Sequence, residues 1–290
     1  MIDYRALTAL AAVVRSGGFE PAAQELCITQ SAVSQRIKGL ENRLGQPVLV
    51  RQTPPIATEL GQRLISHLHM VQHLEKDLTL VNPQVDRVHA RIAINADSIA
   101  TWFPEAIGKI TDEMDVDIVI ADQDKGIELM RRGEVLACLC ADGSAVNGAR
   151  VDRLGIVRYR AYASPDFILR HKLLETPENL YQAPCLQFNE DDTLQHQLLA
   201  SMSQPAPMNP IRCPSSEGFL QMAANGCGFG MIPEMQAAIG IASGNLIDIA
   251  PNNAIDIPLY WHTWRSGGSA MKRLRASVIK SAHRWLEQDR

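Results

Sequence analysis

The sequence lacks a long apolar segment: a charge, glycine or proline interrupts every apolar run in its 290 residues within about 18 residues, too short to span a membrane. Its N-terminus also lacks the basic-then-apolar order of a secretory signal and carries an acid at Asp3. We therefore expect a cytoplasmic protein with no membrane partner. The 46% hydrophobic and 21% charged residues are typical of a globular protein, and the length favours two or three domains.

Motifs of metal and catalytic sites are also missing. The six cysteines form no Cys-x-x-Cys pair, and no His-Glu-x-x-His occurs. There is no Gly-x-Ser-x-Gly elbow and no Walker loop. We therefore predict no metal, no cofactor and no catalytic residue, and we do not expect an enzyme. In a reducing compartment the cysteines are expected to be small, buried apolar residues.

An excess of positive charge is also missing: 28 Lys or Arg stand against 32 Asp or Glu, and the net charge of −4 by itself argues against a protein that binds nucleic acid. The distribution of charge along the chain is more favourable to nucleic-acid binding. Residues 1–58 carry six Lys or Arg and four Asp or Glu, which leaves a net charge of −6 for the remainder. A mildly basic head on an acidic body is compatible with DNA binding.

The first sixty residues predict three short helices and a β-hairpin, the parts of a winged helix-turn-helix over residues 1–58. An apolar stripe ends at a pair of glycines, and PAAQEL follows as the second helix. The segment TQSAVSQRIKGLENRL predicts the third helix, capped by Thr29 or Ser31 and ended by Gly45. PVLVRQTPPIATELG then predicts a strand, a proline-bearing tip and a second strand.

The outer face of the third helix carries short polar and amide side chains that can hydrogen-bond to base edges, with two bases that can reach phosphates. A solvated face on an ordinary amphipathic helix is the competing interpretation. A base at the start of the hairpin can reach the DNA backbone or the minor groove. The predicted DNA-contacting residues are Gln30, Ser31, Ser34, Gln35, Arg36, Lys38 and Arg51.

A long helix follows the hairpin and predicts a dimerisation linker over residues 59–82. Leu64, Val71 and Leu78 are seven residues apart, a short heptad seam suited to pairing with a second copy. Asn-Pro ends this helix, and residues 83–90 form a polar hinge. From residue 91 onward short apolar runs such as VDIVIA and VLACLCA alternate with helical segments, which favours parallel α/β sheets.

The chain resembles a known family. FEPAAQELCITQSAVSQRIKGLENRLGQPVLVR, followed by the long helix, is similar to the head of LysR-type transcriptional regulators. INADSIATWFP, RRGEV, SSEGF and GMIP extend the resemblance and narrow it to the arginine- and lysine-responsive subgroup, ArgP and LysG. Two departures are visible: Val50 replaces the phenylalanine frequent before Arg51, and the wing tip QTPPIA is not basic.

This resemblance implies an α/β fold in which a winged helix-turn-helix and a linker helix precede an effector domain of two subdomains, like those of periplasmic binding proteins. The effector domain would span residues 91–290, with subdomain I over 91–163 and 264–290 and subdomain II over 164–263. The implied partners are double-stranded DNA, a basic amino acid such as lysine or arginine, a second copy in a homodimer or homotetramer, and RNA polymerase. The implied targets are genes of amino-acid export or metabolism.

In open α/β sheets, ligands bind beyond the carboxyl ends of the strands. The strand over residues 91–96 is expected to run into a helix that starts at Asp97 and Ser98. Backbone amides and a hydroxyl at such a start suit a carboxylate, although a plain helix cap is the competing interpretation. With the resemblance, we predict that Ser98 and Thr101 hold the α-carboxylate of an amino acid, beside Trp102.

A basic amino acid also needs an acidic partner for its cation, because an unpaired charge in a closed cleft is costly. Asp122 and Asp124 follow the second strand of the body directly and are the first candidates. For each candidate, a helix cap or a surface charge is the competing interpretation. The next candidates are Asp97, Asp191, Asp192 and Glu217.

Two other functions compete with this hypothesis. The first is a LysR-type regulator that responds to a different small molecule, or to oxidation of Cys185, Cys213 or Cys227. The second is an enzyme on the α/β body, which the missing motifs disfavour.

Overall fold

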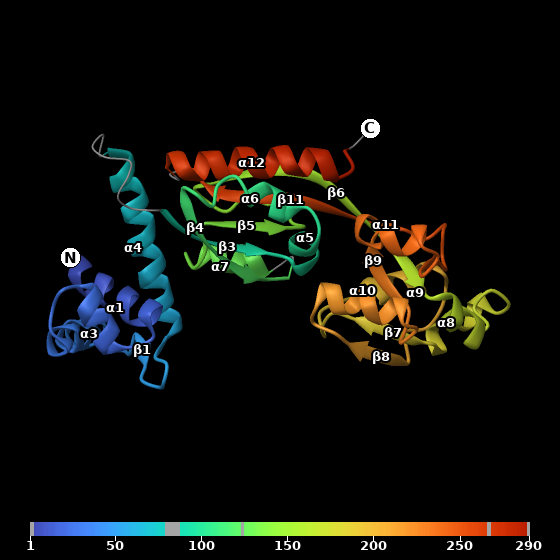
Figure 1. Ribbon diagram of the computed structural model, residues 1–290, viewed down its shortest axis with the longest axis horizontal. Coiled ribbons are helices and arrows are strands. Elements are labelled where there is room, and N and C mark those ends of the chain that lie inside the picture. The colour runs from blue at the N-terminus through green and yellow to red at the C-terminus, as the bar shows by residue number, and fades with distance from the viewer. Residues whose placement is uncertain (1–2, 79–87, 123–124, 266–267, 289–290) are drawn as a thin grey trace.

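A computed structural model describes residues 3–78, 88–122, 125–265 and 268–288 (Figure 1). Three sequence-based expectations therefore fall outside the described residues: the end of the linker at 79–82, most of the hinge, and Asp124. No helix in the described part of the chain is both long enough and apolar enough to cross a bilayer.

The predicted three helices and hairpin of the head are confirmed. The hairpin strands pair in antiparallel fashion, Leu49 opposite Ala57. The elements of the head are α1 (Tyr4–Ser16), α2 (Phe19–Glu25), α3 (Gln30–Leu44), β1 (Leu49–Val50) and β2 (Ile56–Ala57).

Capping fixes the ends of these helices. Of the two residues expected to cap α3, Thr29 takes the role, and its hydroxyl accepts a hydrogen bond of 3.1 Å from the amide of Ala32. Gly17 and Gly45 follow α1 and α3 with φ of 74° and 71°, a backbone region that glycine enters without steric cost.

The core of the head is made by the apolar stripes of α1 and α3 and is closed by the first turns of α4 (Glu59–Leu78). Ile65 and Leu68 of α4 are buried in this core, and Leu60 and Leu64 pack against it. Part of the apolar stripe that predicts a dimer seam is therefore buried in the head of the same chain and is not available to a second copy.

The body is built on one large sheet. Seven of the described strands follow the order β10-β6-β11-β5-β3-β4, with β9 beside β6. The expected parallel pairing holds for β3 with β4 and with β5. The elements of the first subdomain are β3 (Val88–Ile94), α5 (Ala96–Ala100), α6 (Phe103–Ile107), β4 (Met114–Ile120), α7 (Lys125–Arg131), β5 (Ala137–Cys140) and α12 (Ser269–Trp285).

Helices cover both faces of the sheet in this subdomain (Figure 1). Phe103, at the start of α6, lies between Trp102 and Trp261 in the main core, which α12 closes on one face. On the opposite face α7 packs on β5 and β3 through Ile127 and Met130. The sheet is therefore buried on both sides, as parallel sheets are.

The second subdomain contains the remaining short elements. Its β7 and β8 form a separate parallel pair. Its elements are α8 (Pro165–Arg170), the 3-10 helix η1 (Pro177–Gln182), β7 (Pro184–Gln187), α9 (Leu194–Ser201), β8 (Asn209–Arg212), α10 (Ser216–Ala224), β9 (Gly230–Pro233), α11 (Glu234–Ala242) and β10 (Ile247–Asp248).

Two long antiparallel strands join the subdomains: β6 (Ala149–Ala163) and β11 (Ile255–Trp264). The expected limit of subdomain II at residue 263 falls inside β11, because residues 260–263 pair with β5 of the first subdomain. Both strands are shared, so the subdomain limits stay a prediction. The hinge is also shorter than expected, because residues 88–90 already pair with β4.

An ion pair connects the body to the linker helix. Arg132, directly after α7, lies 3.4 Å from Glu59 at the start of α4 and also pairs with Glu128 in α7. One end of α7 is thus in contact with the helix that carries the head.

Candidate functional site

The exposed face of α3 is the candidate DNA surface. At about 100° per residue, the four residues expected to contact bases fall on one side of the helix together with Lys38. Val33 and Ile37 lie on the adjoining face, fully buried in the core of the head. The residues on the open side are Gln30, Ser31, Ser34, Gln35 and Lys38, of which all but the partly buried Ser34 are exposed.

The two remaining candidates lie differently. Arg36 is partly buried and falls on the opposite flank of α3, away from Lys38. Arg51 is exposed beside the wing, 3.4 Å from Glu41, which also accepts a hydrogen bond from the amide of Val48. The ion pair holds Arg51 against α3. The DNA roles of all seven residues stay predictions.

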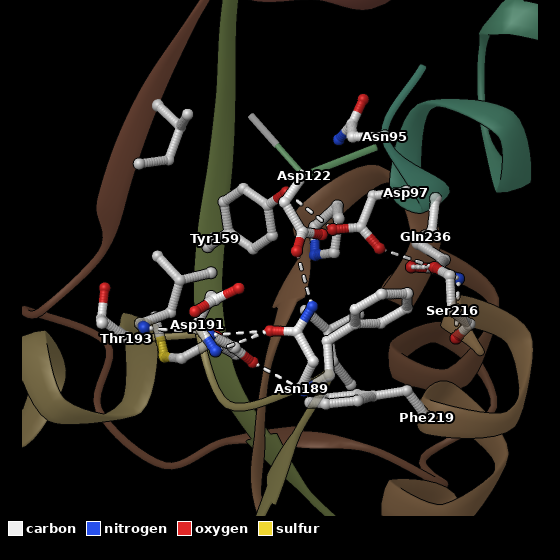
Figure 2. A pocket seen from close by; sticks show the side chains of 18 of the residues that line it. Asn95, Asp97, Asp122, Tyr159, Asn189, Asp191, Thr193, Ser216, Phe219 and Gln236 are labelled. Carbon is white, nitrogen blue, oxygen red and sulfur yellow. Dashed lines mark hydrogen bonds between the residues drawn. The ribbon is translucent and has the colours of Figure 1, made fainter. Parts of the chain in front are cut away.

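A cavity of about 750 Å³ opens between the two subdomains, where the first-subdomain strands end (Figure 2). Asn95 and Asp97 follow β3, and Asp122 follows β4, as the carboxyl ends of neighbouring parallel strands require. The opposite wall comes from the loop before α9, the start of α10 and the start of α11.

Asp97 holds the two subdomains together by hydrogen bonds. Tyr159 of β6 donates to one carboxylate oxygen at 2.7 Å, and Ser216 of α10 donates to the other at 2.7 Å. Gln236 of α11 supports Ser216 by donating to its hydroxyl at 3.0 Å. Burial raises the pKa of Asp97, and the two hydrogen bonds oppose that rise. The result is a carboxylate set deep in the cavity (Figure 2).

Asp122 makes a second contact across the cavity. Asn189, in the loop before α9, donates to it at 2.6 Å. Lys125, the first residue of α7, lies 3.7 Å from Asp122 and 2.7 Å from Asp191 of the second subdomain. Asp192 also lines the cavity and accepts from the amides of the loop around it. With Glu190, two acids of the first subdomain and three of the second thus surround one space.

The floor of the cavity is apolar. Phe219 of α10, with Met231 and Ile232 of β9, lines it from the second subdomain, and Ile257 of β11 closes another side. Gly230 allows this arrangement, because a Cβ there would overlap the ring of Phe219. Aliphatic parts of a ligand can pack on this floor while its polar ends meet the acids above.

Three of the residues expected to bind the effector do not reach the cavity. The helix begins at Ala96 with Asn95 as its N-cap, so the expectation that it begins at Asp97 and Ser98 is wrong. The buried Ser98 hydroxyl instead accepts a hydrogen bond of 3.1 Å from Trp102. Thr101 donates to the carbonyl of Asp97, and Trp102 is fully buried in the core. The reason is that β3 ends at Ile94, two residues before the expected end.

Several cavity residues were missed by sequence reasoning. Tyr159, Asn189 and Gln236 come from three distant segments, and no local pattern marks them. Ser216 lies in SSEGF, where Ser215 caps α10, so a serine pair at a predicted helix start was an available signal. Among the next candidates for the acidic partner, Asp191 and Asp192 line the cavity, whereas Glu217 is exposed and does not line it.

The described residues contain no group of three or more histidine, cysteine or acidic side chains that could hold a metal ion. Of the three cysteines considered for a redox signal, Cys213 is partly exposed, Cys227 is exposed and only Cys185 is buried. Cys138, Cys140 and Cys185 are buried as expected, but Cys27 and Cys227 are exposed. Burial raises the pKa of Cys185 to about 12, which disfavours the reactive thiolate.

Two family descriptions match the chain. Residues 4–62 match "Bacterial regulatory helix-turn-helix protein, lysR family", and residues 84–282 match "LysR substrate binding domain". The chain is 47% identical to the HTH-type transcriptional regulator ArgP of Pseudomonas fluorescens strain Pf0-1, over 99% of each chain.

Solved structures are similar over the whole length. The crystal structure of ArgP from Mycobacterium tuberculosis superposes with a TM-score of 0.80 at 35% identity and covers 100% of both chains. Full-length LysG from Corynebacterium glutamicum with its effector arginine bound gives 0.69 at 29% identity, over 99% of this chain and 100% of the other.

Proposed function

The chain belongs to the LysR family of DNA-binding transcriptional regulators, and from this premise we propose that its effector is a basic amino acid bound in the cavity between the subdomains. Its relatives are named as regulators, not as enzymes. The observation that carries the proposal is the pair of first-subdomain carboxylates, Asp97 and Asp122, which face a space with an apolar floor.

The guanidinium of arginine or the ammonium of lysine would pair with these acids. Besides Asp97, two partly buried and two exposed acids line the cavity. The potential inside the cavity is therefore negative and attracts cations. The aliphatic part of such a side chain would pack on Phe219 and Met231. LysG of Corynebacterium glutamicum, with arginine bound, is similar in fold over nearly the whole chain and supports this choice of ligand class.

The α-carboxylate of the ligand would bind at the first turn of α5. Helix first turns present backbone amides without intrahelical partners, and Asn95, Ala96 and Asp97 all line the cavity. The side-chain oxygen of Asn95 is buried and has no hydrogen-bond partner among the described residues, so it is available to a ligand ammonium. This assignment replaces the Ser98 hydroxyl by backbone amides of the same turn.

DNA would be bound by two heads, each with α3 in a major groove, on a two-fold related site. The open part of α4 would pair with a second copy, in a homodimer or a homotetramer. Such a complex would act in the cytoplasm, at promoters where it can contact RNA polymerase. Its targets would be genes of amino-acid export or metabolism.

The effector is tested by calorimetric titration of the full-length protein with four amino acids. Two are arginine and lysine, and the other two are neutral analogues: citrulline has nearly the shape of arginine, and norleucine is lysine without its terminal ammonium group. We expect one of the basic pair to bind at least about ten-fold more tightly than its neutral analogue, because one charge-assisted hydrogen bond contributes about 1.5–3 kcal/mol. Equal binding of charged and neutral analogues, or no binding of either basic amino acid, would refute the proposed effector.

Coupling to DNA is tested by footprinting of the chain's own promoter region with and without that ligand. A coupling of about 1–3 kcal/mol would change the affinity or the length of the protected site by a measurable factor. A footprint unaffected by the ligand would leave a DNA-binding protein whose cavity serves something else.

A further inference from the structure

Lys125 is the single basic side chain among the described residues that line the cavity, against five acids. Its ammonium lies 2.7 Å from Asp191 and 3.7 Å from Asp122. The other acids are occupied differently: Asp97 accepts from neutral hydroxyls, and Glu190 pairs with Arg212, which does not line the cavity. The ammonium of Lys125 thus occupies carboxylates that would otherwise pair with the cation of the proposed ligand.

The contacts of Lys125 are easily broken. Its side chain is 62% exposed and that of Asp191 is 65% exposed, and exposed ion pairs contribute little because water and salt screen them. The hydrogen bond with Asp191 raises the pKa of Lys125, so the ammonium is charged at neutral pH. The charge is therefore always present under the conditions of binding, but the exposed side chain is free to move.

We propose that Lys125 is a built-in competitor of the effector: in the ligand-free protein its ammonium neutralises Asp122 and Asp191, and a bound basic amino acid displaces it. This role rests on the proposed function, because it assigns Lys125 to the cation end of the same ligand. A second positive charge cannot approach Asp122 without repulsion from Lys125, so the ligand must first push this side chain toward solvent. The affinity is lowered as a result, and neutral ligands are not affected.

A different role for the same geometry is a tether. Lys125 belongs to the first subdomain and Asp191 to the second, so their ion pair also closes the cavity. If closure dominates, loss of the ammonium opens the cavity and weakens binding of every ligand, charged or neutral. The two roles therefore predict changes of opposite sign.

The test is calorimetric titration of full-length wild type, Lys125→Met and Lys125→Arg with arginine and lysine. We expect Lys125→Met to bind the preferred basic amino acid about four-fold more tightly, as expected from removal of one unit charge about 5 Å away in a water-like dielectric. Lys125→Arg keeps the charge and should bind as wild type does. At high salt the gain of Lys125→Met should shrink, because screening weakens the repulsion that it removes.

Arg212→Met is the matched control. It removes an equally exposed cation that pairs with Glu190, an acid of the same cavity, but it leaves Asp122 and Lys125 intact. A comparable gain in Arg212→Met would show a general charge effect and overturn the competitor role. Unchanged or weaker binding by Lys125→Met would overturn it too, and weaker binding with an unchanged melting temperature would favour a tether. If wild type binds neither arginine nor lysine, the proposed function itself fails, an outcome distinct from both.

Discussion

Replacement of Asp97 by asparagine removes one negative charge from the cavity and leaves the size and shape of the side chain nearly unchanged. The variant keeps one carbonyl oxygen, which can still accept from Tyr159. The new amide group cannot accept from Ser216, but a serine hydroxyl can rotate and accept instead, with Gln236 as a further partner. We therefore expect the free energy of unfolding to change by no more than about 1.5 kcal/mol.

The affinity for arginine or lysine should fall much further. A hydrogen bond between two charged groups contributes about 1.5–3 kcal/mol, so its loss weakens binding by about 10- to 150-fold. The neutral analogue citrulline does not need the charge, and its weak binding should be nearly the same in wild type and Asp97→Asn. The ratio between the two ligands isolates the electrostatic part of the effect.

The pH dependence gives an independent measure. Burial raises the pKa of Asp97, and a cation binds only to the ionised form. The affinity of wild type for arginine should therefore decrease as the pH is lowered through that raised pKa, and this component should be absent from Asp97→Asn. The sign for stability is opposite: the folded protein binds this proton more tightly than the unfolded chain, so ionisation of Asp97 lowers stability as the pH rises.

Calorimetric titrations with arginine and citrulline between about pH 8 and about pH 5 measure the affinity for arginine, its ratio to that for citrulline, and the pH dependence of both. Circular dichroism and thermal unfolding of each variant check the fold. The reasoning is refuted if folded Asp97→Asn binds arginine as tightly as wild type, or if the two proteins lose affinity in parallel as the pH falls.

Other predictions concern the head and the cavity floor. Thr29→Ala removes the cap of α3 and should lower the stability of the head by about 1 kcal/mol, measured by urea unfolding of the full chain. Gln30→Ala should weaken binding by about 1–3 kcal/mol at particular base pairs of the operator, whereas Lys38→Met should weaken it evenly and reduce the salt slope by about 1; the reverse assignment in a set of mutated operators would contradict this. Gly230→Ala should force the ring of Phe219 to move, so both the melting temperature and ligand affinity should fall; wild-type values for both would disprove the packing argument.

The head could be predicted from the sequence because its signals are local. The spacing of Val33, Ile37 and Leu40 marks the buried side of α3, and Thr29 and Gly45 mark its two ends. These signals lie within α3 itself and at its two ends, so they do not depend on distant partners.

The body was predicted less completely, because its longest strand depends on distant partners. β6 carries alternating charges, among them Arg158 and Arg160, which pair with Asp256 and Asp248 from other strands. Its segment looks too polar for a strand until those partners are in place. The missed strand is also the one that brings Tyr159 to the cavity.

The residues of the candidate site also divide into those that local sequence signals predict and those that depend on distant partners. Asp97 and Asp122 could be found because they directly follow predicted parallel strands, and that position is sufficient to bring them together. The second-subdomain residues that oppose them depend on how the two halves meet, which no spacing encodes. A strand end misplaced by two residues was enough to move Ser98 from the cavity into the core.

The short helix α7 touches two remote places at once. Its first residue, Lys125, reaches the aspartates of the cavity, and Arg132, just beyond its last residue, meets Glu59 at the root of the linker helix. Seven helical residues measure about 10 Å. The aspartates that hold Lys125 and the ion pair that joins the body to the linker helix are therefore separated by little more than the length of α7, and a rigid-body shift of α7 would move Arg132 relative to Glu59.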